Sequence, residues 1–175
     1  MRRPRLLGLV GVAAYAVHAA VHLARGEPWD LLWTCHLGCL LTGIGLLAGS
    51  ATCNGIGLLW LSIGAPLWVL DLATGGEFMP TSLLTHLGGL VCGIAGVRSL
   101  GLPRGTWLRA LAALGALGAL SRLVTPRRAN VNIAHAVWSG WETVFPSYGV
   151  YAVAVLSGSA AVFLLVELGI RRALR

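Results

Sequence analysis

Four side chains near the ends of apolar segments have the chemistry needed for nucleophilic catalysis: Cys35, His36, Asp71 and His86. A cysteine with a nearby histidine is the minimum apparatus for covalent acyl transfer, because the imidazole can remove the thiol proton. A carboxylate such as Asp71 could orient the imidazole of His86, as in a catalytic triad. Cys35 should lie near the outer end of its helix, where a helix N-terminus favours the thiolate. We therefore predict that Cys35 is the nucleophile and His86 its base, supported by Asp71 or His36.

These residues have other interpretations. A buried cysteine such as Cys35 is commonly a small core residue, and a histidine between helices often makes only a polar contact. Imidazole and carboxylate also suit a zinc or iron site, and histidine can ligate haem. His18 and His22 are the nearest approach to a ligand pair, since they are spaced i, i+4 on one helix face. We predict no metal ligand and no cofactor, because no such pair comes with a glutamate base and the ligands would come from several segments.

Six apolar stretches must position these side chains. The chain of 175 residues is 57% hydrophobic and 11% charged, with a mean hydropathy of +0.79. Each stretch is close to the roughly 20 residues needed to cross a bilayer. The predicted spans are residues 6–24, 31–49, 55–73, 81–98, 107–124 and 148–169. We predict an all-α polytopic protein of the cell membrane, with residues 1–175 forming one bundle of six transmembrane helices.

The charged residues predict how this bundle is oriented. The net charge is +7, and every basic residue is an arginine near the end of a predicted span, so the charge does not indicate nucleic-acid binding. With alternating spans, nine arginines and one acid fall on one side of the membrane, and four arginines and five acids on the other. The positive-inside rule then places both termini in the cytoplasm and the histidines toward the outer face.

The connection formed by residues 125–147 is longer than a simple turn and too polar for another span. Long connections in compact proteins are often lids or binding segments. Its aromatic residues Trp138, Trp141 and Phe145 suit a membrane interface. We predict that this segment folds back over the outer mouth of the bundle as a lid. The residues predicted to bind substrate, with the two arginines holding a lipid phosphate, are Arg127, Arg128, Asn130, Asn132 and His135.

Several short motifs, in order, resemble those of the YwaF-like integral membrane proteins. The motifs are Cys35-His36, Ile63-Gly64-Ala65-Pro66 leading to Phe78-Met79-Pro80, Thr85-His86-Leu87-Gly88, and Asn130-Val131-Asn132 leading to Trp141, Phe145-Pro146 and Tyr148. That superfamily includes a eukaryotic transmembrane acyltransferase that remodels ether phospholipids. The resemblance implies acyltransferase chemistry by a cysteine and a histidine, which map onto Cys35 and His86. A related branch uses threonine as its nucleophile, which makes Thr34 a second candidate.

The sequence thus predicts an acyltransferase or ester hydrolase that acts on membrane lipids through a Cys/His dyad on the outer side. Two alternatives stay open. One is a non-enzymatic binder or small transporter with the histidines as a polar pathway, and the other is a metal or haem redox protein.

Overall fold

The apolar stretches form helices in the computed structural model, which describes residues 2–174. Every regular element in that range is helical. The α-helices are α1 (Arg2–Ala24), α2 (Thr34–Ala48), α3 (Ala51–Ala73), α4 (Pro80–Leu83), α5 (Gly89–Leu100), α6 (Thr106–Val124) and α7 (Tyr148–Ala173). Shorter turns of helix lie between them: the 3₁₀ turns η1 (Pro28–Leu32), η3 (Arg127–Ala129) and η4 (Val131–Ile133), and the π turn η2 (Leu84–Gly88).

Five of these helical segments are long and apolar enough to cross a membrane: Pro4–Ala24, Ala51–Ala73, Pro80–Leu100, Thr106–Val124 and Tyr148–Ala173. The other predicted span is shorter than expected, because α2 has only 15 residues. Pro28 begins a 3₁₀ turn that takes up the first residues of that stretch, and Gly49 ends α2 with a φ of 67°. At about 1.5 Å per residue α2 is about 22 Å long, whereas the hydrocarbon core is about 30 Å thick. Five helical segments are thus long enough to cross a membrane, whereas α2 is shorter than the hydrocarbon core is thick.

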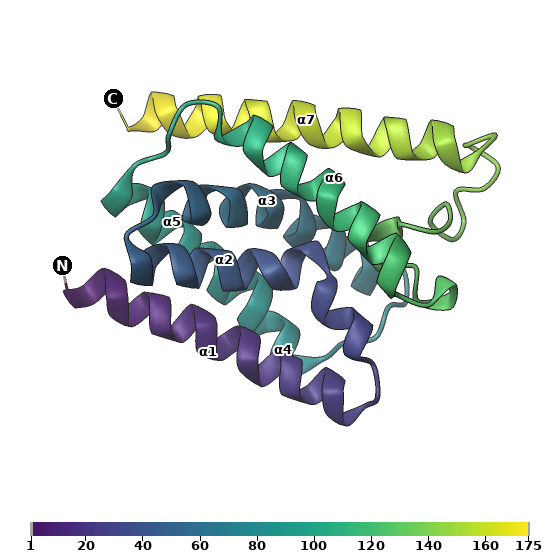
Figure 1. Cartoon of the computed structure of the whole chain (residues 1–175), viewed down its shortest axis with the longest axis horizontal. Helices are drawn as coiled ribbons and strands as arrows, with labels where there is room; N and C mark the ends of the chain where they lie inside the picture. Colours follow the sequence, from purple (N-terminus) through teal and green to yellow (C-terminus); the bar gives the residue numbers. More distant parts are fainter. Residues whose placement is uncertain (1, 175) are drawn as a thin grey trace.

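Helix α2 packs against α1, α3 and α5 (Figure 1). Its approach to α3 depends on Gly45, since a Cβ there would lie 2.5 Å from the backbone nitrogen of Asn54. The fully buried amide of Asn54 donates hydrogen bonds of 3.2 and 3.3 Å to the carbonyls of Thr42 and Cys92. Small residues and one amide thus hold these helices together, as expected where lipid removes the hydrophobic drive for helix association.

Helices α6 and α7 pack against each other and against α3 (Figure 1). The indole of Trp60 in α3 donates a 3.0 Å hydrogen bond to the carbonyl of Ala110 in α6. Glu167 in α7 is buried, and its two carboxylate oxygens accept 2.9 and 2.8 Å hydrogen bonds from the backbone nitrogens of Gly105 and Trp107. The carboxylate satisfies N–H groups at the positive end of α6, so the role of Glu167 is structural.

Helices α4 and α5 are parts of one helical segment, interrupted by the π turn η2. A π turn inserts one extra residue into a helix and frequently marks a functional site. His86 lies inside this turn.

Both chain ends lie at one end of the bundle, whereas the α1–α2 connection and the 125–147 segment lie at the other (Figure 1). His18 and His22 belong to the last two turns of α1 and His36 to the first turn of α2. They are therefore at the end opposite to the termini, which we call the histidine end.

The contact between α2 and α3 leads to a stability prediction. The change Gly45→Ala places a methyl group against the α3 backbone, and overpacking of this kind costs about 1–3 kcal/mol. We expect a lower melting temperature for the detergent-purified protein. Gly118→Ala is the matched control, because no atom lies within 4 Å of a Cβ at that position in α6. Equal melting temperatures for the two variants would contradict the tight α2–α3 contact.

Candidate functional site

The imidazole of His86 is held in one orientation at the histidine end. The ring is 1% exposed and stacks on Trp68, with ring centroids 4.5 Å apart and an interplanar angle of 10°. Nδ1 lies 2.8 Å from the backbone carbonyl of Ser82, and a carbonyl only accepts hydrogen bonds. The proton of the neutral ring is therefore on Nδ1. Nε2 is buried and has no hydrogen-bond partner among the described residues, so its lone pair is free.

Cys35 lies next to this histidine, as the sequence predicts. Ligand atoms of Cys35, His36 and His86 all lie within 4.8 Å of one another. The thiol is in the first turn of α2, next to the backbone N–H groups with which this helix begins. Gly64 of α3 leaves room for it, since a Cβ there would lie 2.7 Å from the Cβ of Cys35. Thr34, the second nucleophile candidate, has its hydroxyl bonded to Asn132.

Three further imidazoles meet beside this pair. The Nε2 atom of His18 lies 3.0 Å from Nε2 of His36 and 3.2 Å from Nε2 of His22. All three rings are buried. The sequence places the histidines at matching depth, and the structure brings four of the five together. We call His18, His22, His36 and His86 the histidine cluster.

The α1–α2 connection surrounds the cluster with oxygen atoms. The carbonyl of Asp30 accepts a 2.9 Å hydrogen bond from Nδ1 of His36. Its carboxylate accepts a 3.0 Å bond from the indole of Trp33 and lies 3.6 Å from Nδ1 of His22. Burial raises the pKa of Asp30, although the indole and His22 act in the opposite direction. Arg25, in the α1–α2 connection, donates two hydrogen bonds to the carboxylate of Glu77, at 2.9 and 2.8 Å. This ion pair lowers the pKa of the exposed Glu77 carboxyl. It also joins the α1–α2 connection to the connection between α3 and α4.

Asn132 fastens the 125–147 segment to the start of α2. Its carboxamide oxygen accepts hydrogen bonds from the backbone nitrogen and the hydroxyl of Thr34, at 2.8 and 2.6 Å. Its nitrogen donates to the carbonyl of Leu32 at 2.7 Å and to the hydroxyl of Ser121 at 2.9 Å. Asn132 adopts a left-handed backbone, with φ of 54°, which asparagine tolerates better than most residues. Asn132 therefore joins this segment to Thr34, the residue that precedes Cys35.

Asn130 and His135 shape the segment itself and do not reach the histidine cluster. The carboxamide oxygen of Asn130 accepts 2.9 and 3.0 Å hydrogen bonds from the backbone nitrogens of His135 and Ala136. The His135 ring is hydrogen-bonded through Nε2 to the hydroxyl of Thr125 at 3.1 Å. The sequence pattern does not predict the different roles of Asn130, Asn132 and His135, because each role depends on the path of a segment without regular secondary structure.

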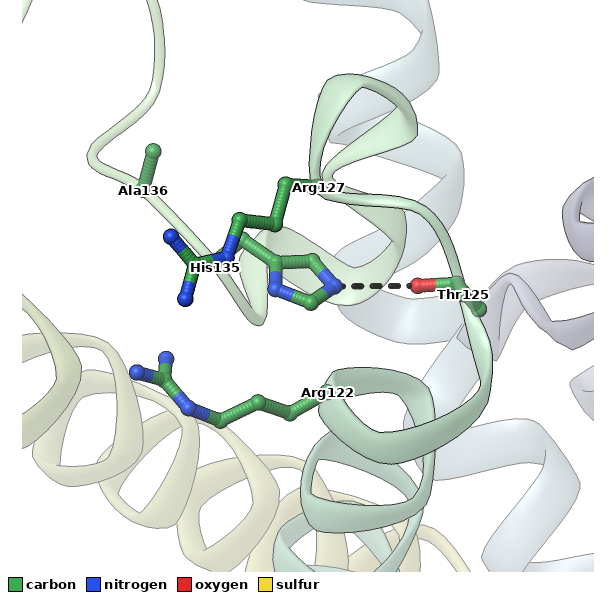
Figure 2. A pocket seen from close by; sticks show the side chains of 5 residues that line it. All are labelled: Arg122, Thr125, Arg127, His135 and Ala136. Atoms are coloured by element: carbon green, nitrogen blue, oxygen red, sulfur yellow. Dashed lines mark hydrogen bonds between the residues drawn. The ribbon is translucent and has the colours of Figure 1, made fainter.

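A pocket of about 470 Å³ opens beside this segment, lined by Arg122, Thr125, Arg127, His135 and Ala136 (Figure 2). We call it the arginine pocket. Figure 2 shows both guanidinium groups extending into the same space next to the His135 ring. Arg122 also donates a 2.7 Å hydrogen bond to the carbonyl of Ala134 and lies over the ring of Tyr148. None of the lining residues is acidic, so the pocket suits an anion.

Two predicted site residues lie elsewhere. The guanidinium of Arg128 lies 5.3 Å above the ring of Trp29 and is not part of the pocket, where Arg122 takes its place. Asp71 forms no ion pair with any residue in the described range, and its carboxylate lies against Gly76 at the end of α3. The Ser82 carbonyl, not Asp71, orients His86. The predicted role of Asp71 in orienting His86 is therefore wrong, because the connection after α3 folds back over the carboxylate.

The aromatic residues of the segment form a small stack. The rings of Trp141 and Phe145 are stacked with centroids 6.1 Å apart, and Phe145 contacts Tyr151 edge-on at 4.9 Å. Trp141 is 50% exposed.

Comparisons of the chain with protein-family models, with curated proteins and with solved structures find no match.

The contacts of Asn132 predict how the segment is anchored. Asn132→Leu removes its hydrogen bonds and leaves the backbone groups of Thr34 and Leu32 unsatisfied, at about 1–3 kcal/mol each. We expect faster hydrogen exchange and easier proteolysis within residues 125–147. Asn132→Asp keeps the acceptor for Thr34 and should give an intermediate effect. Glu142→Gln, at an exposed position of the same segment, is the control. Exchange in Asn132→Leu that matches the Glu142→Gln control would mean that the segment is held by other contacts.

Proposed function

We propose that this protein is a membrane-embedded acyltransferase or ester hydrolase that acts on lipids, with Cys35 as nucleophile and His86 as base. Two observations carry the proposal: a ring nitrogen of His86 lies within 4.8 Å of the Cys35 sulfur, and the buried Nε2 of this histidine has no hydrogen-bond partner among the described residues. A nucleophile next to a base, with a third group orienting that base, is the common arrangement for covalent catalysis. Here the third group is the carbonyl of Ser82. The resemblance to the YwaF-like proteins implies the same two roles for Cys35 and His86.

The proposed reaction has two halves. His86 takes the proton of Cys35 on Nε2, and the thiolate attacks the ester carbonyl carbon of the lipid. The tetrahedral intermediate collapses to a thioester on Cys35, and the departing alkoxide takes the proton from His86. A second lipid hydroxyl or water then gives its proton to His86 and attacks the thioester, which yields the new ester or the free acid. The thiolate regains the proton, so the enzyme returns to its starting state.

The start of α2 supplies the other requirement of acyl transfer, which is stabilisation of the oxyanion. The first N–H groups of a helix have no partner within the helix. The N–H of Thr34 is taken by Asn132, whereas those of Cys35 and His36 lie beside the thiol. Backbone donors near the developing negative charge are the usual form of an oxyanion hole.

The arginine pocket supports a phospholipid as the substrate. Two guanidinium groups without an acidic neighbour are well suited to bind a phosphate through charge-assisted hydrogen bonds. Asn132 connects the pocket to the thiol, since it contacts Ser121 next to Arg122 and Thr34 next to Cys35. A headgroup in the pocket would thus be held on the same side of the bundle as the nucleophile.

The orientation proposed for the membrane is that both termini are cytoplasmic and the histidine end faces outward. Its support is the excess of arginine near the termini, which the positive-inside rule assigns to the cytoplasm. The position of both chain ends at one end of the bundle fits this orientation (Figure 1).

The nucleophile is tested by trapping the thioester. The protein in detergent micelles would be incubated with a phospholipid carrying a fluorescent acyl chain, quenched in acid and examined for a hydroxylamine-labile label. We expect labelling of the wild type and none of Cys35→Ser. His86→Gln should slow labelling by about 10²–10⁴-fold, as loss of a general base does.

Cys39→Ser is the matched control, because that thiol lies one turn further along α2, is fully buried and donates to the carbonyl of Gly11. It should label like the wild type. Labelling that survives in Cys35→Ser would remove the proposed nucleophile. Absence of label and of turnover in the wild type, across diacyl and ether phospholipids, would favour the non-enzymatic alternative.

The arginine pocket is tested with soluble short-chain phosphatidic acid. Removing a charge-assisted hydrogen bond costs about 1.5–3 kcal/mol, so Arg127→Gln should weaken binding about 10- to 100-fold in calorimetric titrations. Arg128→Gln should bind normally, because that side chain stacks on Trp29. A short-chain diacylglycerol, which lacks the phosphate, should bind all three proteins alike. Equal losses in the two arginine variants would show that the effect is general charge and not the pocket.

The orientation is tested by cysteine labelling in intact cells with an impermeant thiol reagent. The exposed positions Arg104→Cys, at the terminal end, and Ser139→Cys, at the histidine end, are the two probes. We expect external labelling of Ser139→Cys only. External labelling of Arg104→Cys would reverse the orientation.

A further inference from the structure

We infer that His18, His22 and His36 form a binding site for a single divalent transition-metal ion, with Zn²⁺ as the reference ion. This inference does not depend on the proposed acyl transfer. It rests on three buried histidines from α1 and α2, each of which offers one ring nitrogen within 4.8 Å of the other two, and on the short contacts of His18 Nε2 with Nε2 of both neighbours.

The spacing of the nitrogen atoms is that of a metal site. Zinc binds histidine nitrogen at about 2.0–2.1 Å in a tetrahedral arrangement, which puts neighbouring nitrogens about 3.3 Å apart. The Nε2 atom of His18 is 3.0 Å from that of His36 and 3.2 Å from that of His22. The rings of His18 and His36 are nearly perpendicular, at 81°, and those of His18 and His22 at 88°. Three rings that meet only at their Nε2 corners can direct three lone pairs to one point.

Hydrogen bonding alone satisfies these contacts poorly. Nδ1 of His36 faces the carbonyl of Asp30, so the proton of its neutral ring is on Nδ1 and its Nε2 is a lone pair. The single Nε2 position of His18 must then serve two neighbours. If His18 Nε2 carries a proton, that proton is shared between Nε2 of His36 and Nε2 of His22. If it carries none, its lone pair faces the lone pair of His36 Nε2. A cation accepts all three lone pairs at once, and such buried nitrogens need a partner.

The groups behind the rings are those that normally surround metal-bound histidines, which donate their other N–H to an oxygen. Nδ1 of His36 has the Asp30 carbonyl at 2.9 Å, and Nδ1 of His18 has the hydroxyl of Thr81 at 2.8 Å. Nδ1 of His22 is buried, has no hydrogen-bond partner in the described range, and faces carboxylate oxygens of Glu27 and Asp30 at 3.4 and 3.6 Å.

The local charge also suits a divalent ion. Arg25 pairs with both Glu27 and Glu77, so these three residues together with Asp30 give the surroundings a net charge that offsets the metal, which matters in a site with little water. Neutral imidazole ligands suit zinc, copper, nickel and iron rather than magnesium or calcium, which prefer oxygen. Three histidines leave a fourth coordination position open for water or a carbonyl oxygen, as in catalytic zinc sites.

The experiment measures metal binding by the full-length protein in detergent, after treatment with a chelator. Zn²⁺ binding would be quantified by elemental analysis and calorimetry, and Co²⁺ would report the ligand type through its absorption spectrum. We expect a single Zn²⁺ per chain and the visible bands of four-coordinate Co²⁺ without thiolate charge transfer. His18→Gln, His22→Gln and His36→Gln should each weaken binding by more than about 100-fold, since loss of an outer partner alone costs about 10- to 100-fold.

Thr81→Val is the graded variant, because it keeps all three ligands and removes only the hydroxyl behind His18. It should weaken binding about 10- to 100-fold. His135→Gln is the control histidine, which lies outside the cluster and is bonded to Thr125. It should bind Zn²⁺ normally, as should Cys35→Ser, which abolishes acyl transfer and so separates the two hypotheses.

Three results would overturn the inference. The first is a wild-type protein that binds no Zn²⁺ or Co²⁺ at micromolar concentrations. The second is retention of binding in His22→Gln, provided that the variant keeps its helical circular-dichroism spectrum. The third is loss of binding in Cys35→Ser together with thiolate charge transfer in the Co²⁺ spectrum, which would place the ion at Cys35, His36 and His86 instead.

Discussion

The rest of the site depends on the hydrogen bonds that the carboxamide of Asn132 makes. It bonds at once to the first N–H of α2, to the carbonyl that precedes this helix and to the end of α6. A helix that begins inside an apolar bundle exposes N–H groups that water cannot reach, and each unsatisfied group is costly. By satisfying one of them, Asn132 allows α2 to begin at Thr34, with the thiol of Cys35 in the following position. The same residue joins the 125–147 segment, which contributes to the arginine pocket, to the start of α2.

The polar groups of the histidine end form two layers with different roles. The inner layer consists of imidazoles and a thiol, whose free atoms face one another. The outer layer consists of backbone carbonyls, hydroxyls and carboxylates, which fix each ring from behind through contacts such as Ser82 to His86 and Asp30 to His36. His36 is common to both groups, since its ligand atom lies within 4.8 Å of those of Cys35 and His86 and its Nε2 lies 3.0 Å from that of His18.

The sequence predicts the helices well, because length and hydropathy are local properties. It overestimates α2, since Leu31, Leu32 and Trp33 continue the apolar run although Pro28 starts a separate turn there. The depth of the histidines is also predictable, as alternating spans place them at one end. Side-chain partners are not. The 3₁₀ turn η3 directs Arg127 and Arg128 to different surroundings, and sequence neighbours therefore do not share a role.

The short length of α2 has a consequence for the surrounding lipid. A helix about 8 Å shorter than the hydrocarbon core produces a local hydrophobic mismatch, to which a bilayer responds by thinning. In the proposed orientation α2 would end at the inner face at Gly49, the shortfall would fall at its start, and Cys35 would lie below the level of the headgroups. In a phospholipid the ester carbonyls likewise lie deeper than the phosphate. The protein would therefore meet an ester at its natural depth, with the acyl chain still in the hydrocarbon layer and no need to extract the lipid from the membrane.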